Sequence, residues 1–138
     1  MAGYSGTPLI KKLGLKPGQT VQFVNAPANY LKLLGPLPDG LKMRRAGPGV
    51  RIGNLDFIHV FSKERAELEK LLPRLVKQIV PAGMIWVSWP KKTSGVPTTV
   101  TEKVIREVAL PLGLVEVKVC AVDDTWSGLK LVIRVDRR

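Results

Sequence analysis

Residues 55–80 read LDFIHVFSKERAELEKLLPRLVKQIV, and this stretch joins two different hydrophobic patterns. Residues 55–61 are almost continuously apolar, which is typical of a strand that is buried on both faces of a sheet. After Ser62, which is expected to cap a helix, apolar residues recur every three or four positions as far as Val80 and predict one buried helical stripe. A buried strand followed directly by an amphipathic helix is the repeating unit of a parallel sheet with helices packed on it.

The rest of the chain continues this alternation of strands and helices. Apolar and β-branched runs predict further strands, at residues 20–24, 41–45, 84–89, 115–122 and 129–135. Helical patterns and capping residues predict further helices, at residues 7–13, 27–34 and 99–109. A turn is predicted at Pro81-Ala82-Gly83. The last two strands are joined by a short loop, so they are expected to pair as an antiparallel hairpin.

Together these elements predict one α/β domain over residues 1–138, with a three-layer Rossmann-like arrangement. The sheet is expected to be mostly parallel, with helices on both faces and an antiparallel hairpin at its C-terminal end. Two segments, Lys16-Pro17-Gly18 and Val80-Pro81-Ala82-Gly83, resemble turns that precede strands in class I methyltransferases. The predicted fold therefore resembles a shortened class I methyltransferase fold.

Several sequence blocks along most of the chain are more specific than the order of elements. They lie at residues 2–9, 24–27, 34–38, 86–92, 106–114 and 126–130. The most specific are Trp89-Pro90-Lys91-Lys92 and Trp126-Ser127-Gly128-Leu129-Lys130. With these blocks the chain resembles the bacterial family catalogued as domain of unknown function 3052. The resemblance implies a bacterial protein and brings no activity, cofactor or site residue with it.

The cofactor signature of the methyltransferase-like fold is missing at both of its positions. A nucleoside cofactor lies over a glycine-rich turn after the first strand, and here this turn reads Asn25-Ala26-Pro27-Ala28-Asn29. An acid at the end of the second strand holds the ribose hydroxyls, and here that strand ends with Met43-Arg44-Arg45. The residues therefore identify no cofactor. A transferase that uses S-adenosylmethionine or another nucleoside cofactor with a degenerate motif remains an alternative, because the crevice of the fold is still available.

Open α/β sheets bind ligands at the carboxyl ends of their strands, near the point where the strand order reverses. Three predicted strand ends carry polar, cationic or aromatic residues, and the helix that starts near Thr99 adds a positive dipole end. These residues are Asn25, Ser62, Lys63, Ser88, Trp89, Lys91, Lys92, Thr93 and Ser94, with Trp126 as a further flat apolar wall. They predict a binding module with a pocket for a small phosphate- or carboxylate-bearing ligand. In the alternative interpretation Pro90 only stops the strand, the lysines are solvated and the tryptophans belong to the core.

The sequence holds no other recognisable catalytic motif. It lacks a Walker A run, a Gly-x-Ser-x-Gly motif and a Cys-x-x-Cys pair, and its single histidine excludes a His-rich metal site. His59 lies inside an apolar strand and is expected to be a buried imidazole bonded to a neighbouring group. Cys120 is expected to be a core or edge residue of its strand, and Asp123-Asp124 a solvated turn. These features favour a binding protein over an enzyme.

The chain is strongly basic, with a net charge of +11 and an isoelectric point of about 10.2. Residues 1–55 hold eight Lys and Arg against one acid, Asp39. Such a surface attracts polyanions, so nucleic-acid binding is a further alternative, although few aromatic residues accompany the charges. No apolar run is long enough for a membrane span, and no signal peptide is apparent. With a single cysteine, Cys120, these features predict a cytoplasmic protein.

Overall fold

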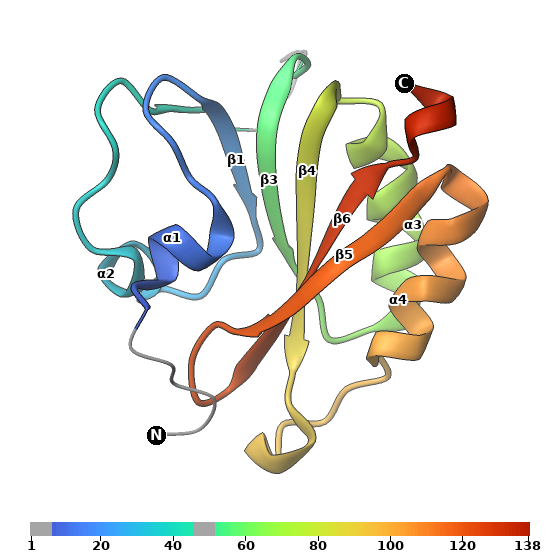
Figure 1. Ribbon diagram of the computed structural model, residues 1–138. Coiled ribbons are helices and arrows are strands. Elements are labelled where there is room, and N and C mark those ends of the chain that lie inside the picture. The colour runs from blue at the N-terminus through green and yellow to red at the C-terminus, as the bar shows by residue number, and fades with distance from the viewer. Residues whose placement is uncertain (1–6, 46–51) are drawn as a thin grey trace.

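The computed structural model describes residues 7–45 and 52–138, which form a six-stranded sheet between two layers of helices (Figure 1). The strands are β1 (Thr20–Val24), β2 (Lys42–Met43), β3 (Leu55–Phe61), β4 (Ile79–Pro90), β5 (Leu114–Ala121) and β6 (Trp126–Ile133). The α-helices are α1 (Leu9–Leu13), α2 (Tyr30–Leu34), α3 (Arg65–Val76) and α4 (Glu102–Ala109). Single 3-10 turns follow β4, α4 and β6, namely η1 (Lys92–Ser94), η2 (Leu110–Leu112) and η3 (Val135–Arg137).

The sheet has the strand order β2-β1-β3-β4-β6-β5. The strands from β2 to β4 are parallel, while β6 runs antiparallel both to β4 and to β5. This arrangement confirms the predicted Rossmann-like α/β fold with its C-terminal hairpin. The chain leaves β1 toward β2 on one side and returns to β3 on the other, so the strand order reverses at β1. In sheets of this kind the ligand crevice lies at such a reversal.

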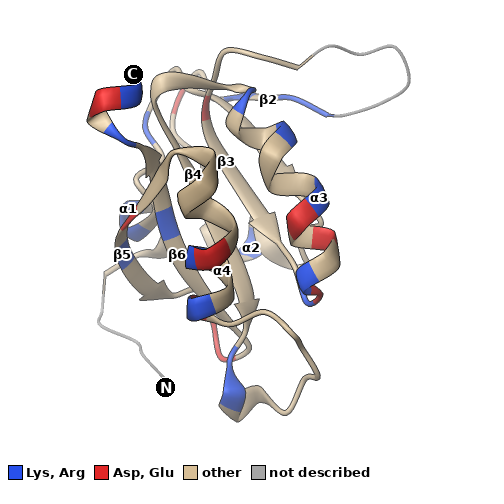
Figure 2. Ribbon diagram, turned by 90° about the vertical axis from the view of Figure 1, so that its right-hand side faces the viewer, with Lys and Arg blue, Asp and Glu red and all other residues tan. Residues whose placement is uncertain are grey.

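Strand β3 packs against both helix layers. Ile58 and Val60 belong to the core beneath α3 and α4, which lie side by side on one face (Figure 2). Phe57 and Phe61 belong to the core on the side of α1 and α2. Asp56 is the one partly exposed residue of this strand, and its carboxylate accepts a hydrogen bond from the backbone N–H at the start of β1 (2.8 Å). Burial on both faces accounts for the continuous apolar run in the sequence.

The helix after β3 is shorter than its hydrophobic pattern predicts. α3 ends at Val76, and Ile79 and Val80 open strand β4 instead of closing the helix. The prediction was wrong at this point because Ile79 keeps the helical spacing of apolar residues. In the structure it pairs with Leu55 in the sheet, and it is buried there as it would be on the helical stripe. A residue that must be buried in either structure gives the same hydrophobic signal for both.

The predicted turn at residues 81–83 is also part of β4. It forms an irregularity in the pairing of β3 with β4, where the register shifts between Leu55 and Phe57. A Cβ atom on Gly83 would lie 3.0 Å from the Val80 carbonyl oxygen and 3.1 Å from that of Leu55. The glycine therefore lets the chain bulge closely against its neighbour without leaving the sheet.

The two long helices each begin later than predicted. The N-cap residue of α3 is Glu64 rather than Ser62, and that of α4 is Thr101 rather than Thr99. The Thr99 hydroxyl instead accepts a hydrogen bond from the Arg65 N–H (2.7 Å). The threonine-rich segment before α4 therefore joins the starts of the two helices.

His59 lies in the centre of β3 and has no exposure to solvent. Its Nδ1 atom lies 2.6 Å from the Tyr30 hydroxyl, and its Nε2 atom lies 2.7 Å from the Ser88 hydroxyl. Burial lowers the pKa of His59 to about 3 and raises the pKa of Tyr30, so both side chains are uncharged at neutral pH. A neutral imidazole has one donor and one acceptor nitrogen, and each has a partner here. The expectation of a buried, hydrogen-bonded His59 is confirmed.

We expect His59 to make the protein less stable as the pH is lowered from about 6.5 toward 4. The unfolded chain gains a proton on this ring in that range, whereas the folded protein, with a His59 pKa of about 3, does not. The loss reaches about 3 kcal/mol at pH 4. Urea unfolding across this range measures it, with His59→Gln as the control that lacks the titrating ring. An equal loss of stability in both proteins would contradict the expectation.

Candidate ligand-binding site

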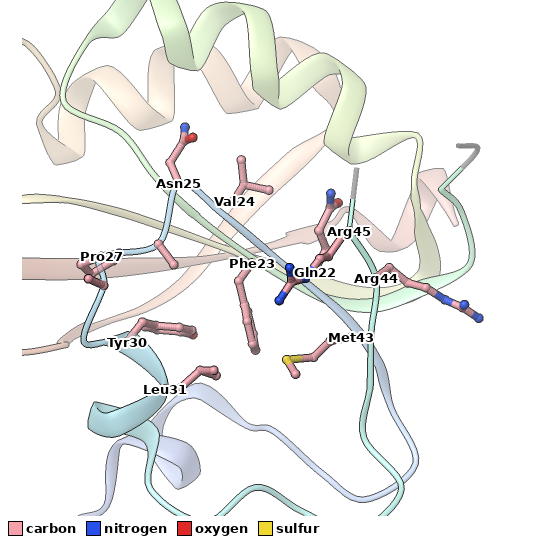
Figure 3. A pocket seen from close by; sticks show the side chains of 12 residues that line it. Gln22, Phe23, Val24, Asn25, Pro27, Tyr30, Leu31, Met43, Arg44 and Arg45 are labelled. Atoms are coloured by element: carbon pink, nitrogen blue, oxygen red, sulfur yellow. The ribbon is translucent and has the colours of Figure 1, made fainter. Parts of the chain in front are cut away.

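A pocket of about 570 Å³ opens at the carboxyl ends of β1 and β2, where the strand order reverses (Figure 3). Its walls come from β1, the turn after it, the start of α2 and the end of β2. β2 pairs with β1 only at Lys42 and Met43, so it is shorter than the predicted strand over 41–45. Residues 22–24 of β1 therefore have no paired strand on this side among the described residues, and the pocket occupies the space beside them.

One wall of the pocket is apolar and is formed by Phe23, Tyr30, Leu31 and Met43 (Figure 3). The Phe23 and Tyr30 rings pack edge to face, with 4.9 Å between their centroids. Leu31 is 51% exposed and Met43 is 47% exposed, although both are apolar. Two large apolar side chains that face water beside an aromatic ring form a surface that a flat ligand group can cover.

Arg44 and Arg45 lie at the rim of the same pocket, directly after β2. Both are exposed, and Arg44 extends outward in Figure 3. Within residues 7–45 and 52–138 neither arginine takes part in an ion pair, and no acidic residue lines the pocket. By contrast, Arg65 and Arg106 near the opposite helices are each held by two glutamates. The rim of the pocket therefore carries positive charge that no described acid neutralises.

The turn after β1 contains no glycine, yet its first residue has the backbone conformation that glycine favours. Asn25 has a φ of 56°, in the left-handed region, where asparagine is enriched over most other residue types. Its side-chain amide donates to the Phe61 carbonyl oxygen across the end of the sheet (3.5 Å). The absence of glycine from this segment of the sequence is therefore compatible with a tight turn.

Gln22 is a pocket residue that the sequence did not reveal. Its side chain is 5% exposed and lines the pocket from β1. Its Oε1 atom is buried and has no hydrogen-bond partner in the part of the chain that the structure describes. Leaving a buried acceptor unpaired costs about 1–3 kcal/mol. The only sign of Gln22 in the sequence is that it is a polar residue inside the run of residues 20–24. A half-exposed strand with alternating polar and apolar residues would look the same, so the sequence does not indicate that Gln22 is buried.

A second pocket, of about 470 Å³, adjoins the first, and Asn25 and Pro27 line both of them. It brings together four residues of the predicted site, namely Asn25, Ser62, Lys63 and Trp126. The Trp126 ring packs edge to face against Phe61, with 5.1 Å between the centroids. Two glutamates near the start of α3 also line this pocket, so its charge is mixed rather than cationic.

The other predicted site residues line neither of these two pockets. Ser88 is fully buried and contacts His59, while Trp89 packs against the core beneath α3 and α4. Lys91, Lys92, Thr93 and Ser94 form a loop that projects beyond the carboxyl end of β4 (Figure 1). The structure thus divides the predicted residues between a pocket, the protein interior and a separate loop.

The loop at residues 91–94 is held by hydrogen bonds of its own. The Lys91 N–H donates to the Thr125 carbonyl oxygen (2.7 Å), and the Ser94 hydroxyl donates to the Lys91 carbonyl oxygen (2.6 Å). The Val104 N–H at the start of α4 donates to the Thr101 hydroxyl (3.2 Å) rather than to a group of this loop. Binding of an anion by the loop stays a prediction.

Two further expectations concern Cys120 and the hairpin turn. Burial raises the pKa of the half-buried Cys120 thiol, so this side chain is not a thiolate at neutral pH. The Asp123 carboxylate accepts hydrogen bonds from the Thr125 and Trp126 N–H groups (2.8 and 2.7 Å), as expected of a turn-forming residue.

The described residues contain no group of three or more His, Cys, Asp or Glu side chains arranged for a metal ion. None of the helices described is both long and apolar enough to cross a membrane.

Solved structures with a similar fold include several methyltransferases. A SAM-dependent methyltransferase from Aquifex aeolicus has a TM-score of 0.65 at 16% identity, over 91% of this chain and 88% of that chain. A ribosomal protein L11 methylase from Lactobacillus delbrueckii subsp. bulgaricus has a TM-score of 0.59 at 16% identity, over 91% and 75% of the two chains. The magnesium protoporphyrin IX methyltransferase (ChlM) from Synechocystis PCC 6803 with bound SAH has a TM-score of 0.58 at 10% identity, over 91% and 78%. No family model and no curated protein matches the sequence. At these identities the likeness shows the fold alone.

S-adenosylmethionine does not fit the residues that line the first pocket. The molecule carries a positive sulfonium group, and nucleoside cofactors in folds of this kind need a hydrogen-bond acceptor for the ribose hydroxyls near the second strand. At the end of the second strand the rim of the pocket has Arg44 and Arg45, whose positive charges repel the sulfonium group. The described lining is therefore better suited to an anion than to this cofactor.

We expect Asn25→Val to destabilise the protein by about 1–2 kcal/mol, because a β-branched residue is poorly tolerated at a φ of 56°. Asn25→Gly should stay within about 0.5 kcal/mol of the parent. Asn29→Val is the matched control, because Asn29 is an exposed asparagine of the same turn with a φ of −91° and no capping side-chain hydrogen bond. Urea unfolding measures all three variants. Similar losses in the two valine variants would show that the backbone of Asn25 is not the constraint.

Proposed function

We propose that this protein is a binding module for a small anionic ligand that also carries a flat apolar group, held in the pocket beside β1 and β2. The observation that carries the proposal is the pair Arg44 and Arg45, without an acidic partner among the described residues, at the rim of a pocket with an apolar wall. A guanidinium group matches phosphate and carboxylate geometry, because it can donate two parallel hydrogen bonds to either.

The distribution of acidic residues supports this choice of site. Acidic and basic residues both occur along α3 and α4 (Figure 2). Arg65 pairs with Glu69 and Glu107 there, so its positive charge is already compensated. Arg44 and Arg45, which pair with no described acid, are therefore more available to an anion than Arg65.

The apolar wall explains why the ligand needs more than a charge. Exposed ion pairs contribute only about 0–1 kcal/mol in water. A flat group that covers Phe23, Leu31 and Met43 adds apolar burial, and it also removes water from the neighbouring guanidinium groups. Electrostatic attraction strengthens as water is removed. A phosphate or carboxylate attached to a ring therefore uses the apolar wall and the cationic rim together.

A methyltransferase that uses S-adenosylmethionine is a second candidate function. It is supported by the fold of the Aquifex aeolicus SAM-dependent methyltransferase and by that of ChlM with bound SAH. The cationic rim and the absence of glycine from the turn after β1 count against it. The two candidates differ in the charge of the ligand, so direct binding measurements separate them.

The double variant Arg44→Ala with Arg45→Ala is expected to lose most of the thermal stabilisation that pyrophosphate and citrate give the parent protein. Exposed ion pairs contribute about 0–1 kcal/mol each, so the loss of both arginines should weaken binding of these two anions by up to about thirtyfold. Both side chains are exposed, so the melting temperature without ligand should stay nearly unchanged. A thermal-shift titration measures both quantities.

Lys91→Ala with Lys92→Ala is the matched control for this experiment, since it removes the same charge from the loop after β4. This variant should respond to pyrophosphate and citrate as the parent does. If the lysine variant loses the response and the arginine variant keeps it, the anion site is the loop at residues 91–94 and the proposal fails.

Isothermal titration with S-adenosylmethionine and S-adenosylhomocysteine tests the second candidate. We expect no heat of binding with the cationic S-adenosylmethionine, because the positive charges of Arg44 and Arg45 at the rim of the pocket repel it. Binding of either compound with a micromolar dissociation constant would favour the methyltransferase and count against the anion-binding module.

A further inference from the structure

The pocket contains backbone hydrogen-bonding groups because no strand in the described ranges pairs with this part of β1 on the side of β2. The N–H groups of Lys42 and Arg44 donate to the carbonyl oxygens of Gln19 and Val21 (2.9 and 2.8 Å). Along a strand, the backbone groups of every second residue point to the same side, so those of Phe23 point into the gap beyond Arg44. The described part of the chain places no strand opposite Phe23 on this side. A ligand in the pocket therefore meets one N–H donor and one carbonyl acceptor beside the Phe23 ring.

Gln22 adds a buried amide to the same pocket. Its side chain is 5% exposed, and its Oε1 atom has no partner in the described ranges 7–45 and 52–138. The two arginines cannot supply an acceptor, because a guanidinium only donates. The amide of Gln22 can take a hydrogen bond from a hydroxyl or amine of a ligand. A ligand that satisfies it therefore carries such a donor next to its anionic group.

The turn after β1 is poorly suited to a phosphate, although dinucleotide-binding folds hold the pyrophosphate at the equivalent turn. It contains no glycine, and Pro27 has no N–H to donate. Helix α2 has five residues, and the N–H of its first residue, Tyr30, donates to the Pro27 carbonyl oxygen (3.0 Å). The cations lie instead after β2, on the side where folds of this kind hold the ribose hydroxyls or a phosphate attached to them.

We infer that the ligand is a nucleoside whose phosphate is attached to the 2′ or 3′ oxygen of the ribose rather than to the 5′ oxygen. The base covers the apolar wall around Phe23, and Arg44 and Arg45 bind the phosphate. The neighbouring ribose hydroxyl donates to the amide oxygen of Gln22. This inference rests on the proposed anion site and names the class of ligand that the site takes.

The isomeric adenosine monophosphates with the phosphate on the 2′, 3′ or 5′ oxygen test the position of the phosphate. They contain the same atoms and carry the same charge, so any difference in affinity reports the position alone. Isothermal titration of the full chain is expected to show the 2′ or the 3′ isomer binding at least about tenfold more tightly than the 5′ isomer. Equal affinities, or tighter binding of the 5′ isomer, would overturn the inference.

Gln22→Met tests the role of the amide and keeps the volume of the side chain, so the fold should persist. It should weaken binding of the preferred isomer about tenfold and leave the 5′ isomer unchanged. Gln78→Met is the matched control, because Gln78 also has a buried amide oxygen without a partner among the described residues and does not line the pocket. No loss of affinity in Gln22→Met, or an equal loss in Gln78→Met, would show that Gln22 does not contact the ligand.

Inorganic pyrophosphate separates a failure of this inference from a failure of the proposed function. If pyrophosphate binds in a manner that depends on Arg44 and Arg45 and no adenosine monophosphate binds, the anion site stands and the nucleoside assignment is wrong. If neither pyrophosphate nor any of the three isomers binds, both proposals are wrong. If the 2′ or 3′ isomer binds tightly and Arg44→Ala with Arg45→Ala removes its advantage over the 5′ isomer, the assignment is supported.

Discussion

His59 sits at the centre of β3 without access to water, and its two ring nitrogens are bonded to hydroxyl groups from α2 and β4. An unpaired polar group at this depth would be costly, so the contact with Tyr30 fixes the start of α2 against the sheet. Tyr30 in turn packs against Phe23, whose ring forms part of the pocket wall. The wall of the pocket is therefore positioned by the interior of the sheet and not by the turn that borders it.

The arginines on the two sides of the molecule have different surroundings. On one side, Arg65 joins α3 to α4 through Glu107, and Arg106 joins α4 to β5 through Glu116. These contacts occupy both guanidinium groups with carboxylates of the same chain. Arg44 has no such contact with an acid in the described part of the chain, and it remains available at the edge of the sheet. The difference separates arginines that pair with glutamates of neighbouring elements from arginines that no described acid occupies.

The order of elements could be predicted because β3 and α3 each bury a continuous pattern of apolar residues. Boundaries could not be predicted where one residue satisfies two patterns, as Ile79 does at the junction of α3 and β4. The cationic end of the second strand was visible in the sequence, but its importance depends on β2 stopping at Met43, which no periodicity in so short a segment reveals. The burial of Gln22 depends on tertiary packing and has no signature in the residue order. The sequence therefore predicted the edge of the sheet at which the candidate site lies, but it did not predict most of the residues that line the site.

The shortness of β2 has a consequence for how the molecules behave in concentrated solution. Among residues 7–45 and 52–138, no strand pairs with residues 22–24 of β1 on the side of β2, and an open edge is a template for a strand from another molecule. Arg44 and Arg45 stand at this edge, where a second copy would bring two more positive charges against them. Their mutual repulsion opposes edge-to-edge pairing between copies. Any substitution that neutralises the pair therefore also lowers the concentration at which the protein begins to self-associate.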